Sequence, residues 1–335
     1  MSGARVSVLM AVHNEGEYLA ATLASLQHQT LHDWELVVVD DGSDDATPEI
    51  LAEVARRDPR VQVVSPGKIG LVAALNLGLE RCHAPLLARM DGDDICHPQR
   101  FKRQLETMTH APDLDLLATR IRHFPRPSLS DGMRAYEEWL NSHLEHDEIA
   151  RDVFVESPFA NPSVMLRTAK LRDLGGYIDY GWPEDYDLWL RYAASGARFA
   201  RLPETLLFWR DHPDRLTRTS PAFTLQAFRT CRAHYLRQGY LAGHDSVTLW
   251  GAGKEGKAWR KTLENIGIRV SRWVEIDRRK IGQCIHSAPV VSFDALAPGQ
   301  GPMLITIGAR AARPQVREFA AARGLREGHD FICVT

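Results

Sequence analysis

The sequence predicts an α/β protein with two domains. Short apolar runs rich in β-branched residues alternate with amphipathic stretches at helical spacing from the start of the chain. This alternation is the pattern of βαβ units and a largely parallel sheet flanked by helices. The chain has 335 residues, which corresponds to about two domains at roughly 150 residues each.

The composition is that of a folded globular protein, with 44% hydrophobic and 25% charged residues. Lys and Arg number 41 against 43 Asp and Glu, so no basic excess is available for a phosphate backbone, and we expect no nucleic-acid partner. The five cysteines include no Cys-x-x-Cys pair, which indicates neither a disulfide framework nor a zinc site and fits a cytoplasmic protein. The apolar run 6–12 is too short for a signal peptide or a transmembrane segment.

The first elements follow one another in βα order. We expect strands at 6–12, 35–39, 61–64 and 86–90, a helix through Leu19, Leu23 and Leu26, and helices at 49–56 and 71–81. Acidic turns, Asp40-Asp41-Gly42-Ser43 and Asp91-Gly92-Asp93-Asp94, follow two of these strands. Ligands bind beyond the carboxyl ends of strands in open α/β sheets, so both turns and His13-Asn14 should line one crevice.

The second half divides into an irregular region and a smaller α/β unit. We expect a cap or insertion at 125–159, helices at 185–194 and 223–238, a linker at 239–244, strands at 247–250, 269–275, 303–307 and 331–334, and helices at 257–266 and 314–323. The predicted domains are therefore 1–240 and 245–335. The arginines and aromatics of 223–238 allow either packing between the domains or contact with an anionic membrane surface.

The acidic turns carry the chemistry, each with a structural alternative. Closely spaced carboxylates at Asp91–Asp94 can share a divalent cation with phosphates, or form a solvated corner. Asp41 can accept the imide N–H of a uracil or ribose hydroxyls, or cap a helix. Glu184-Asp185 opens a predicted helix, where acidic residues are favoured in any case. His212 can complete a metal site or be structural.

Four ordered motifs together resemble the family 2 glycosyltransferases of the GT-A fold. They are the run from Val6 to Glu15, the run from Leu36 to Thr47 containing Asp40-Asp41-Gly42-Ser43, the glycine-led run from Gly70 to Gly78, and the run from Ala88 to Asp94. The resemblance extends over about 5–219. It departs from the family pattern at Ala11, His13 and Asn161.

The resemblance implies roles for individual residues. The donor site would comprise Val12, Asn14, Glu15, Asp41, Gly70, Asn76, Arg89 and Asp91. Within it, Asp41 would contact the nucleobase and Asp91 the ribose side. Asp93 would hold Mg²⁺ or Mn²⁺ at the diphosphate, with His212 as a further metal ligand. Glu184 and Asp185 would activate the acceptor, and Trp182 would either stack on it or belong to the core.

The resemblance thus predicts a metal-dependent, inverting glycosyltransferase. It would move a sugar from a nucleotide-diphosphate sugar, with UDP favoured, to a hydroxyl of a saccharide or lipid-linked saccharide in cell-surface polysaccharide or glycoconjugate synthesis. We expect it in the cytoplasm, with peripheral contact at the inner membrane face as a variant of this hypothesis. The alternative of a non-catalytic nucleotide-sugar sensor would be marked by loss of Asp93 or Asp185, and both residues are present.

A glycine-rich turn opens the C-terminal unit. Gly251, Gly253 and Gly256 follow a predicted strand, and Glu275 comes about twenty residues later, which satisfies the dinucleotide fingerprint. The unit is similar to small Rossmann-like modules appended to some sugar-modifying enzymes. Its size allows only one mononucleotide-binding half, which argues against an NAD(P)-dependent oxidoreductase. A phosphate loop and a purely structural turn both remain open.

Overall fold

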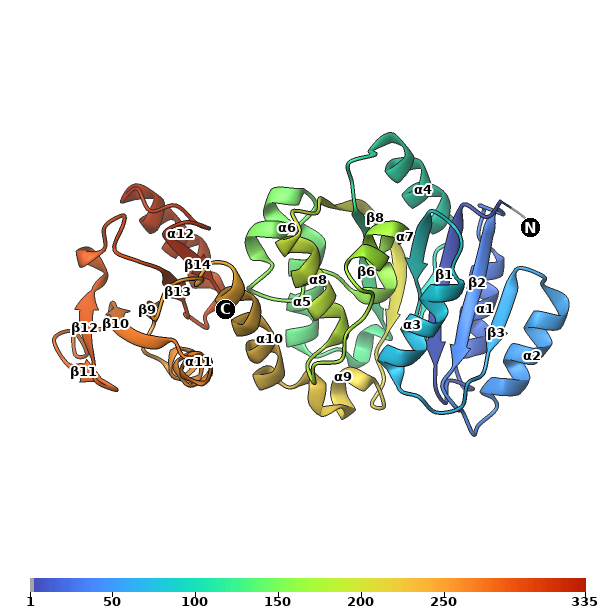
Figure 1. Cartoon of the computed structure of the whole chain (residues 1–335), viewed down its shortest axis with the longest axis horizontal. Coiled ribbons are helices and arrows are strands. Elements are labelled where there is room, and N and C mark those ends of the chain that lie inside the picture. Colours follow the sequence, from blue (N-terminus) through green and yellow to red (C-terminus); the bar gives the residue numbers. More distant parts are fainter. Residues whose placement is uncertain (1–2) are drawn as a thin grey trace. The chain divides into compact units, whose positions relative to one another are not determined.

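The computed structural model describes residues 3–335 and divides into two compact units (Figure 1). The first unit comprises the chain up to Ala150, Pro158–Tyr180 and Asp187–Ser220. The second comprises Arg151–Ser157, Gly181–Tyr186 and Pro221–Thr335. Two segments that precede 221 in the sequence, 151–157 and 181–186, thus belong to the second unit. The division into domains 1–240 and 245–335 stays a prediction.

The first unit is built on an eight-stranded sheet in the order β3-β2-β1-β4-β7-β6-β8-β5. Its strands are β1 (Val6–Val12), β2 (Trp34–Asp40), β3 (Val61–Val64), β4 (Leu86–Arg89), β5 (Ile95–Cys96), β6 (Leu116–Phe124), β7 (Met165–Arg167) and β8 (Phe199–Arg210). Pairing is parallel from β3 through β4 and between β6 and β8, whereas β7 and β5 pair antiparallel with their neighbours. This sheet and its helices confirm the predicted α/β class.

Helices flank this sheet. They are α1 (Leu19–Gln27), α2 (Thr47–Arg57), α3 (Leu71–Arg81), α4 (Arg100–His110), α5 (Asp131–Ser142), α6 (His146–Asp152), α7 (Thr168–Asp173), α8 (Glu184–Ala194) and α9 (Leu216–Thr219), with short 3₁₀ turns at Arg126–Ser128 and Asn161–Ser163. The irregular region expected at 125–159 therefore contains two helices, α5 and α6.

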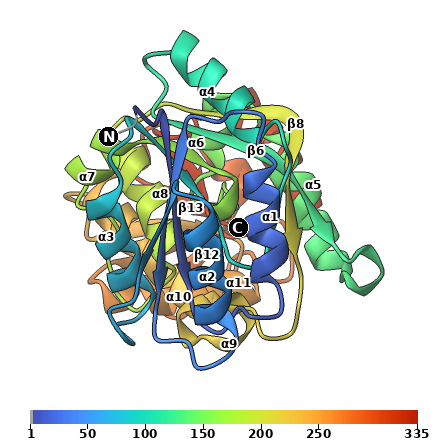
Figure 2. The same ribbon diagram turned by 90° about the vertical axis from the view of Figure 1, so that its right-hand side faces the viewer.

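Strand alternation sets the two layers around β1. Val8 and Met10 belong to a core that includes Leu23 of α1 and Leu51 of α2. Leu9 points to the opposite face, where a Cβ on Gly78 of α3 would collide with it. Accordingly, Figure 2 shows α3 on one side of β1 and β2, with α1 and α2 on the other.

The parallel strands end at a common edge. In the strand register, Val12 at the end of β1 lies beside Asp40 at the end of β2. On the other side of β1, Leu9 pairs with Arg89, the last residue of β4. The turns that follow these three strands are therefore neighbours, as their acidic residues predicted.

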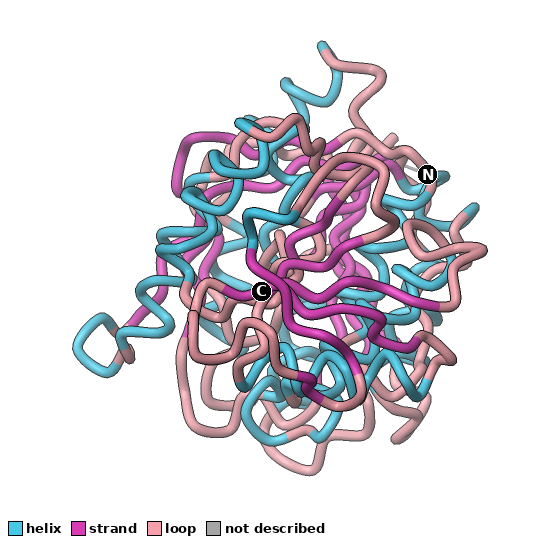
Figure 3. The backbone as a smooth tube through the Cα atoms, turned by 90° about the vertical axis from the view of Figure 1, so that its left-hand side faces the viewer, coloured by secondary structure: helices cyan, strands magenta, loops and turns pink. Residues whose placement is uncertain are grey.

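The second unit has its own sheet, in the order β11-β12-β10-β9-β13-β14. Its elements are α10 (Leu225–Gln238), β9 (Ser246–Trp250), α11 (Lys254–Asn265), β10 (Arg269–Glu275), β11 (Cys284–Ile285), β12 (Ala288–Ser292), β13 (Met303–Ile305), α12 (Arg313–Ala322) and β14 (Phe331–Cys333), with 3₁₀ turns at Pro221–Phe223, Phe293–Ala295 and Arg310–Ala312. Pairing is parallel from β12 through β14. The strands are the magenta segments nearest the viewer in Figure 3.

Helix α10 is built into the second unit. Ala233 and Leu236 belong to the same core cluster as Val247 and Trp259. Two of its arginines, Arg229 and Arg232, are only 8% and 9% exposed, so they do not present a basic face to a membrane. Within residues 3–335, none of the helices has the length and apolar character needed to cross a bilayer.

Candidate functional site

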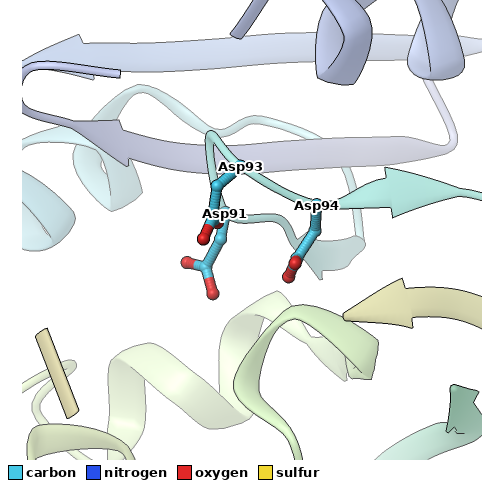
Figure 4. Close-up of side chains that lie close together, drawn as sticks. All are labelled: Asp91, Asp93 and Asp94. Atoms are coloured by element: carbon cyan, nitrogen blue, oxygen red, sulfur yellow. The ribbon is translucent and has the colours of Figure 1, made fainter. Parts of the chain in front are cut away.

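The turn between β4 and β5 brings three carboxylates together. Asp91, Asp93 and Asp94 each place an oxygen within 4.8 Å of the others. Figure 4 shows the three side chains pointing to the same side of this turn. The turn is anchored from α1, because the Thr22 hydroxyl lies 2.8 Å from the carbonyl oxygens of both Gly92 and Asp94.

Asp94 is the most enclosed of the three. Its side chain is fully buried, and Oδ1 accepts a hydrogen bond from the Arg210 backbone N–H at 2.7 Å. Oδ2 is buried and has no hydrogen-bond partner among residues 3–335. Burial and the neighbouring charges of Asp93 and Asp91 raise the pKa of Asp94 well above its usual range. An unpartnered buried carboxylate oxygen beside two further carboxylates calls for a cation.

Residues of β8 and the segment after it complete the surroundings of Asp93. His212 Nε2 lies 3.0 Å from Asp93 Oδ2, and Arg210 Nε donates to the Asp93 carbonyl at 2.6 Å. The Arg210 guanidinium also stacks 4.5 Å from the centres of the Tyr18 and Phe124 rings. Burial and Asp91 raise the pKa of Asp93, against the opposing effects of Arg215 and His212. The structure therefore joins the two residues that the resemblance named as metal ligands.

Glu15, at the end of β1, adds a fourth acidic group. It packs against the turn so closely that a Cβ on Gly92 would lie 3.0 Å from Glu15 Cγ. Burial, followed by the charges of Asp93, Asp91 and Asp45, raises the pKa of Glu15 to about 8. The acidic residues around this turn therefore destabilise one another's ionised forms.

The donor set fits a hard divalent cation. Carboxylate oxygens and water are the ligands that Mg²⁺ and Mn²⁺ prefer, and imidazole accommodates transition metals. A cation here would give the orphaned Asp94 oxygen a partner and offset the repulsion among the acidic groups. Asp91, Asp93 and Asp94 could hold it, with His212 at its edge.

The turns after β1 and β2 are joined by reciprocal hydrogen bonds. Asn14, at φ 57°, donates from its backbone to Ser43 and from its side chain to Asp44 at 2.8 Å. The Asp44 backbone N–H donates back to Asn14 Oδ1 at 2.9 Å. Glu15 is fixed in turn by its backbone bond to Thr47. Asn14 thus locks the turn that places Glu15.

Asp41 holds the entrance to α3. Its Oδ1 accepts the backbone N–H groups of Ile69 at 2.5 Å and Gly70 at 2.8 Å. Gly70 has φ 89°, a conformation that favours glycine, and precedes the first residue of α3. Asp41 is 7% exposed. In this structure Asp41 anchors the turn before α3, and its predicted contact with the nucleobase stays a prediction.

Three other residues that were predicted to bind the sugar donor are buried or bonded to other residues of the first unit. Asn76 bonds both the N–H and the carbonyl of Tyr177, at 2.9 and 2.8 Å. Arg89 is 2% exposed and pairs with Asp91 at 2.6 Å. Val12 is buried at the end of β1. Arg89 and Val12 lie at the acidic edge, whereas Asn76 fastens the 175–177 turn to α3.

The predicted acceptor residues occur in the second unit. Glu184 and Asp185 open α8, and Asp185 Oδ1 accepts the Tyr186 backbone N–H at 2.7 Å. The Trp182 ring lies 5.3 Å from that of His234 on α10. Their roles toward an acceptor stay predictions.

Comparison with known proteins now decides the family. The sequence profile described as Glycosyl transferase family 2 matches residues 7–174, half of the chain, and this range contains the acidic turn. The chain belongs to glycosyl transferase family 2. This glycosyltransferase is 34% identical to the amylovoran biosynthesis glycosyltransferase AmsE of Erwinia amylovora over 218 residues, covering 63% of this chain and 78% of AmsE.

A second relative has a more specific name. The UDP-Gal:alpha-D-GlcNAc-diphosphoundecaprenol beta-1,3-galactosyltransferase of Escherichia coli is 26% identical over 246 residues, covering 72% of this chain and 87% of that enzyme. Among solved structures, S. aureus TarS 1–349 in complex with UDP-GlcNAc superposes with a TM-score of 0.57 at 16% identity, covering 78% of this chain and 71% of TarS. These matches confirm the predicted enzyme class and GT-A fold of the glycosyltransferase.

The glycine turn of this glycosyltransferase is tightly packed at the start of α11. A Cβ on Gly256 would lie 1.8 Å from the Gly251 carbonyl oxygen, and Gly251 has φ 114°. Glu275 Oε1 accepts the Ala252 N–H at 2.9 Å. Gly253 faces open space. The backbone conformation of Gly251 and the close packing of Gly256 thus explain why these two positions are glycine. A phosphate-binding role for the turn stays a prediction.

Two residues of the site, Asp94 and Arg210, had no individual role predicted from the sequence. Asp94 was predicted only as part of the acidic turn, and Arg210 was not predicted. A sequence signal existed for each, because Asp94 follows Asp93 directly and Arg210 is two residues from His212. The burial that distinguishes Asp94 from a solvated turn residue depends on β8 and could not be seen in the sequence.

Proposed function

We propose that this glycosyltransferase transfers a sugar from a nucleoside-diphosphate donor, with UDP favoured, to a hydroxyl acceptor in a metal-dependent, inverting reaction. The observation that carries the metal dependence is the cluster of Asp91, Asp93 and Asp94 with its orphaned buried oxygen. The donor would bind along the edge formed by the ends of β1, β2 and β4. Gly70 and Asp41 lie at this edge through the turn before α3.

The chain's charged groups have defined tasks in this proposal. Mg²⁺ or Mn²⁺ held by Asp93 and its neighbours would act as a Lewis acid toward the departing nucleoside diphosphate. Arg210 fixes the Asp93 backbone, and His212 fixes its carboxylate, so both residues keep the cluster in place. Asp91 is oriented by Arg89.

Asp185 is the proposed general base. The acceptor oxygen forms a bond to the anomeric carbon while the bond from that carbon to the diphosphate breaks, and the hydroxyl proton passes to the Asp185 carboxylate. Asp185 lies in the first turn of α8, at the positive end of the helix dipole, where acidic residues are favoured. A single displacement of this kind inverts the configuration at the anomeric carbon.

The acceptor class is argued from the relatives. The names of AmsE and the galactosyltransferase refer to amylovoran biosynthesis and to a GlcNAc on diphosphoundecaprenol. We therefore propose a saccharide or lipid-linked saccharide as acceptor, in the synthesis of a cell-surface polysaccharide or glycoconjugate. The reaction would take place on the cytoplasmic side, where nucleotide sugars are the donors.

The test is calorimetric binding of UDP and GDP with and without Mn²⁺. We expect Mn²⁺-dependent binding of one diphosphate by the wild-type protein and its loss in Asp93→Ala. Asp113→Ala is the matched control, because Asp113 is an exposed aspartate of the same unit that pairs with Arg198 at 3.2 Å. Binding that is indifferent to Mn²⁺ and to Asp93→Ala, or binding of NAD alone, would contradict the proposed site.

A further inference from the structure

The second unit contains the segment that carries Asp185, and this suggests what the unit does. We infer that the C-terminal unit fixes the Glu184-Asp185 pair, with Tyr186 and Arg232 as positioning residues. The inference rests on the proposed role of Asp185. It concerns contacts inside the second unit, to which 151–157, 181–186 and 221–335 all belong.

Tyr186 is the first link. Its side chain is fully buried, its hydroxyl donates to the Val153 carbonyl at 2.7 Å, and its ring lies 5.5 Å from that of Phe228 on α10. Its backbone N–H donates to Asp185 Oδ1 at 2.7 Å. The residue next to the proposed base is thus fixed at its backbone and at the far end of its side chain. A shift of Val153 would therefore be passed on to Asp185.

Arg232 is the second link, and it fixes the segment that Tyr186 contacts. Its guanidinium donates to the carbonyls of Val155 at 3.0 Å, Phe154 at 3.3 Å and Val334 at 2.8 Å. It is 9% exposed. The three carbonyls surround one terminal nitrogen, Nη1, while Nε of the same guanidinium donates to the Phe228 carbonyl of α10 at 3.3 Å. Arg232 thereby joins the 151–157 segment to the chain after β14.

The 151–157 segment is also anchored by packing and charge. Phe154 packs against one core cluster of the C-terminal unit, and Val155 is part of the other. Asp152 forms an ion pair with Arg317 of α12, whose guanidinium also pairs with Glu327 at 2.8 Å. Buried side chains and a charge network therefore fix Val153 from both sides, and the anchor of Tyr186 is rigid.

This arrangement gives the C-terminal unit a function without any ligand in its glycine turn. A catalytic group must be held in productive geometry, and a displacement of about 1 Å can cost on the order of a hundredfold in rate. The series of contacts from Arg232 through Val153 to Tyr186 supplies such support for Asp185. The residues proposed to bind the donor and the metal belong to the first unit and take no part in these contacts.

The experiment compares Tyr186→Phe and Arg232→Gln with Tyr240→Phe in the full-length protein. Tyr240 is the matched control, because its hydroxyl also bonds backbone groups of the second unit, those of Met303. Two quantities are measured: hydrogen exchange of the 181–186 amides, and kcat with the donor KM. Arg232→Lys is included as the conservative variant.

We expect faster exchange at 181–186 and a kcat lowered by about tenfold in Tyr186→Phe and Arg232→Gln. The donor KM and the Mn²⁺-dependent affinity for UDP should stay within about twofold, with Arg232→Lys intermediate and Tyr240→Phe like the wild type. Unchanged exchange at 181–186 in both variants, or faster exchange with full kcat, would overturn the inference. Failure of the proposed function would look different, because the wild type itself would then lack metal-dependent UDP binding or transfer.

Discussion

His212 Nε2 lies 3.0 Å from Asp93 Oδ2, although 119 positions separate the two residues in the chain. The pair connects the turn after β4 with the segment after β8 at the acidic edge of the sheet. A neutral imidazole there can bind a cation or orient the carboxylate that does so. The relationship makes the metal site dependent on two distant parts of the sequence.

Replacement of His212 tests this dependence. His212→Ala should weaken Mn²⁺ binding in the presence of UDP by about tenfold to a hundredfold, as loss of a metal ligand or of its supporting partner does. Titration calorimetry measures the change. His28→Ala is the control, because His28 is an exposed histidine that bonds its own helix. Equal Mn²⁺ affinity in His212→Ala and the wild type would show that the imidazole has no part in cation binding.

The pKa of Glu15 predicts how stability depends on pH. Burial and nearby carboxylates raise the pKa of Glu15 from 4.5 to about 8. The folded state therefore binds this proton more tightly than the unfolded state does, and stability falls as pH rises from about 4.5 to about 8. Mn²⁺ favours the ionised groups, so the increase in Tm on adding Mn²⁺ should be larger at pH 8.5 than at pH 6.

Glu15→Gln supplies the control for this pH dependence. The amide does not titrate, so the metal-free variant should lose less stability between pH 6 and pH 8 than the wild type. Glu17→Gln changes a neighbouring, exposed glutamate, and the stability of this variant should depend on pH as that of the wild type does. A metal-free Tm that rises over this interval in the wild type would contradict the predicted direction.

Asp185 can be tested apart from the donor site. Asp185→Asn should lower kcat by about 10²- to 10⁴-fold, because the amide cannot accept the acceptor proton. Mn²⁺-dependent UDP binding should persist. Steady-state transfer assays and calorimetry on the same preparation separate the two effects. If UDP binding were lost together with kcat, Asp185 would have to serve the donor and not the acceptor.

The glycine turn predicts a sharp difference between two alanine substitutions. Gly256→Ala places a Cβ 1.8 Å from the Gly251 carbonyl oxygen, and overpacking of this kind should destabilise the unit by about 2 kcal/mol. Gly253 has φ −83° and faces open space, so Gly253→Ala should cost less than about 0.5 kcal/mol. Hydrogen exchange of the α11 amides reports both changes, and similar effects of the two substitutions would refute the close packing.

The local pattern of the sequence predicted the fold class and the acidic edge well. Strand periodicity and the turns after β2 and β4 were sufficient to gather Asp41 and Asp93 at one edge, because parallel strands end together. The acidic motif predicted Asp93 as a metal ligand, and His212 was a candidate for completing the same site. These predictions depend on short-range patterns in the sequence. They succeed because residues that follow parallel strands lie close together at one edge of the sheet.

What the sequence could not show depends on tertiary packing. The hydrogen-bond partner of the buried Asp94 carboxylate is the Arg210 backbone, more than a hundred residues later, and the raised pKa of Glu15 arises from burial and from the carboxylates of the surrounding turns. Asp41 bonds backbone N–H groups at 69 and 70, which no side-chain pattern records. The sequence likewise does not show that 151–157 belongs to the second unit, because the residues around Phe154 and Val155 do not differ in type from those of the first core.

The same inclusion limits how freely this C-terminal region can be exchanged. Val155 shares its cluster with Val274, Met303 and Phe331. A chain ended at 240 would leave Val155 without these neighbours and Arg232 without the Val334 carbonyl. Grafting this region onto a relative would therefore require matching residues in the middle of the recipient's catalytic domain.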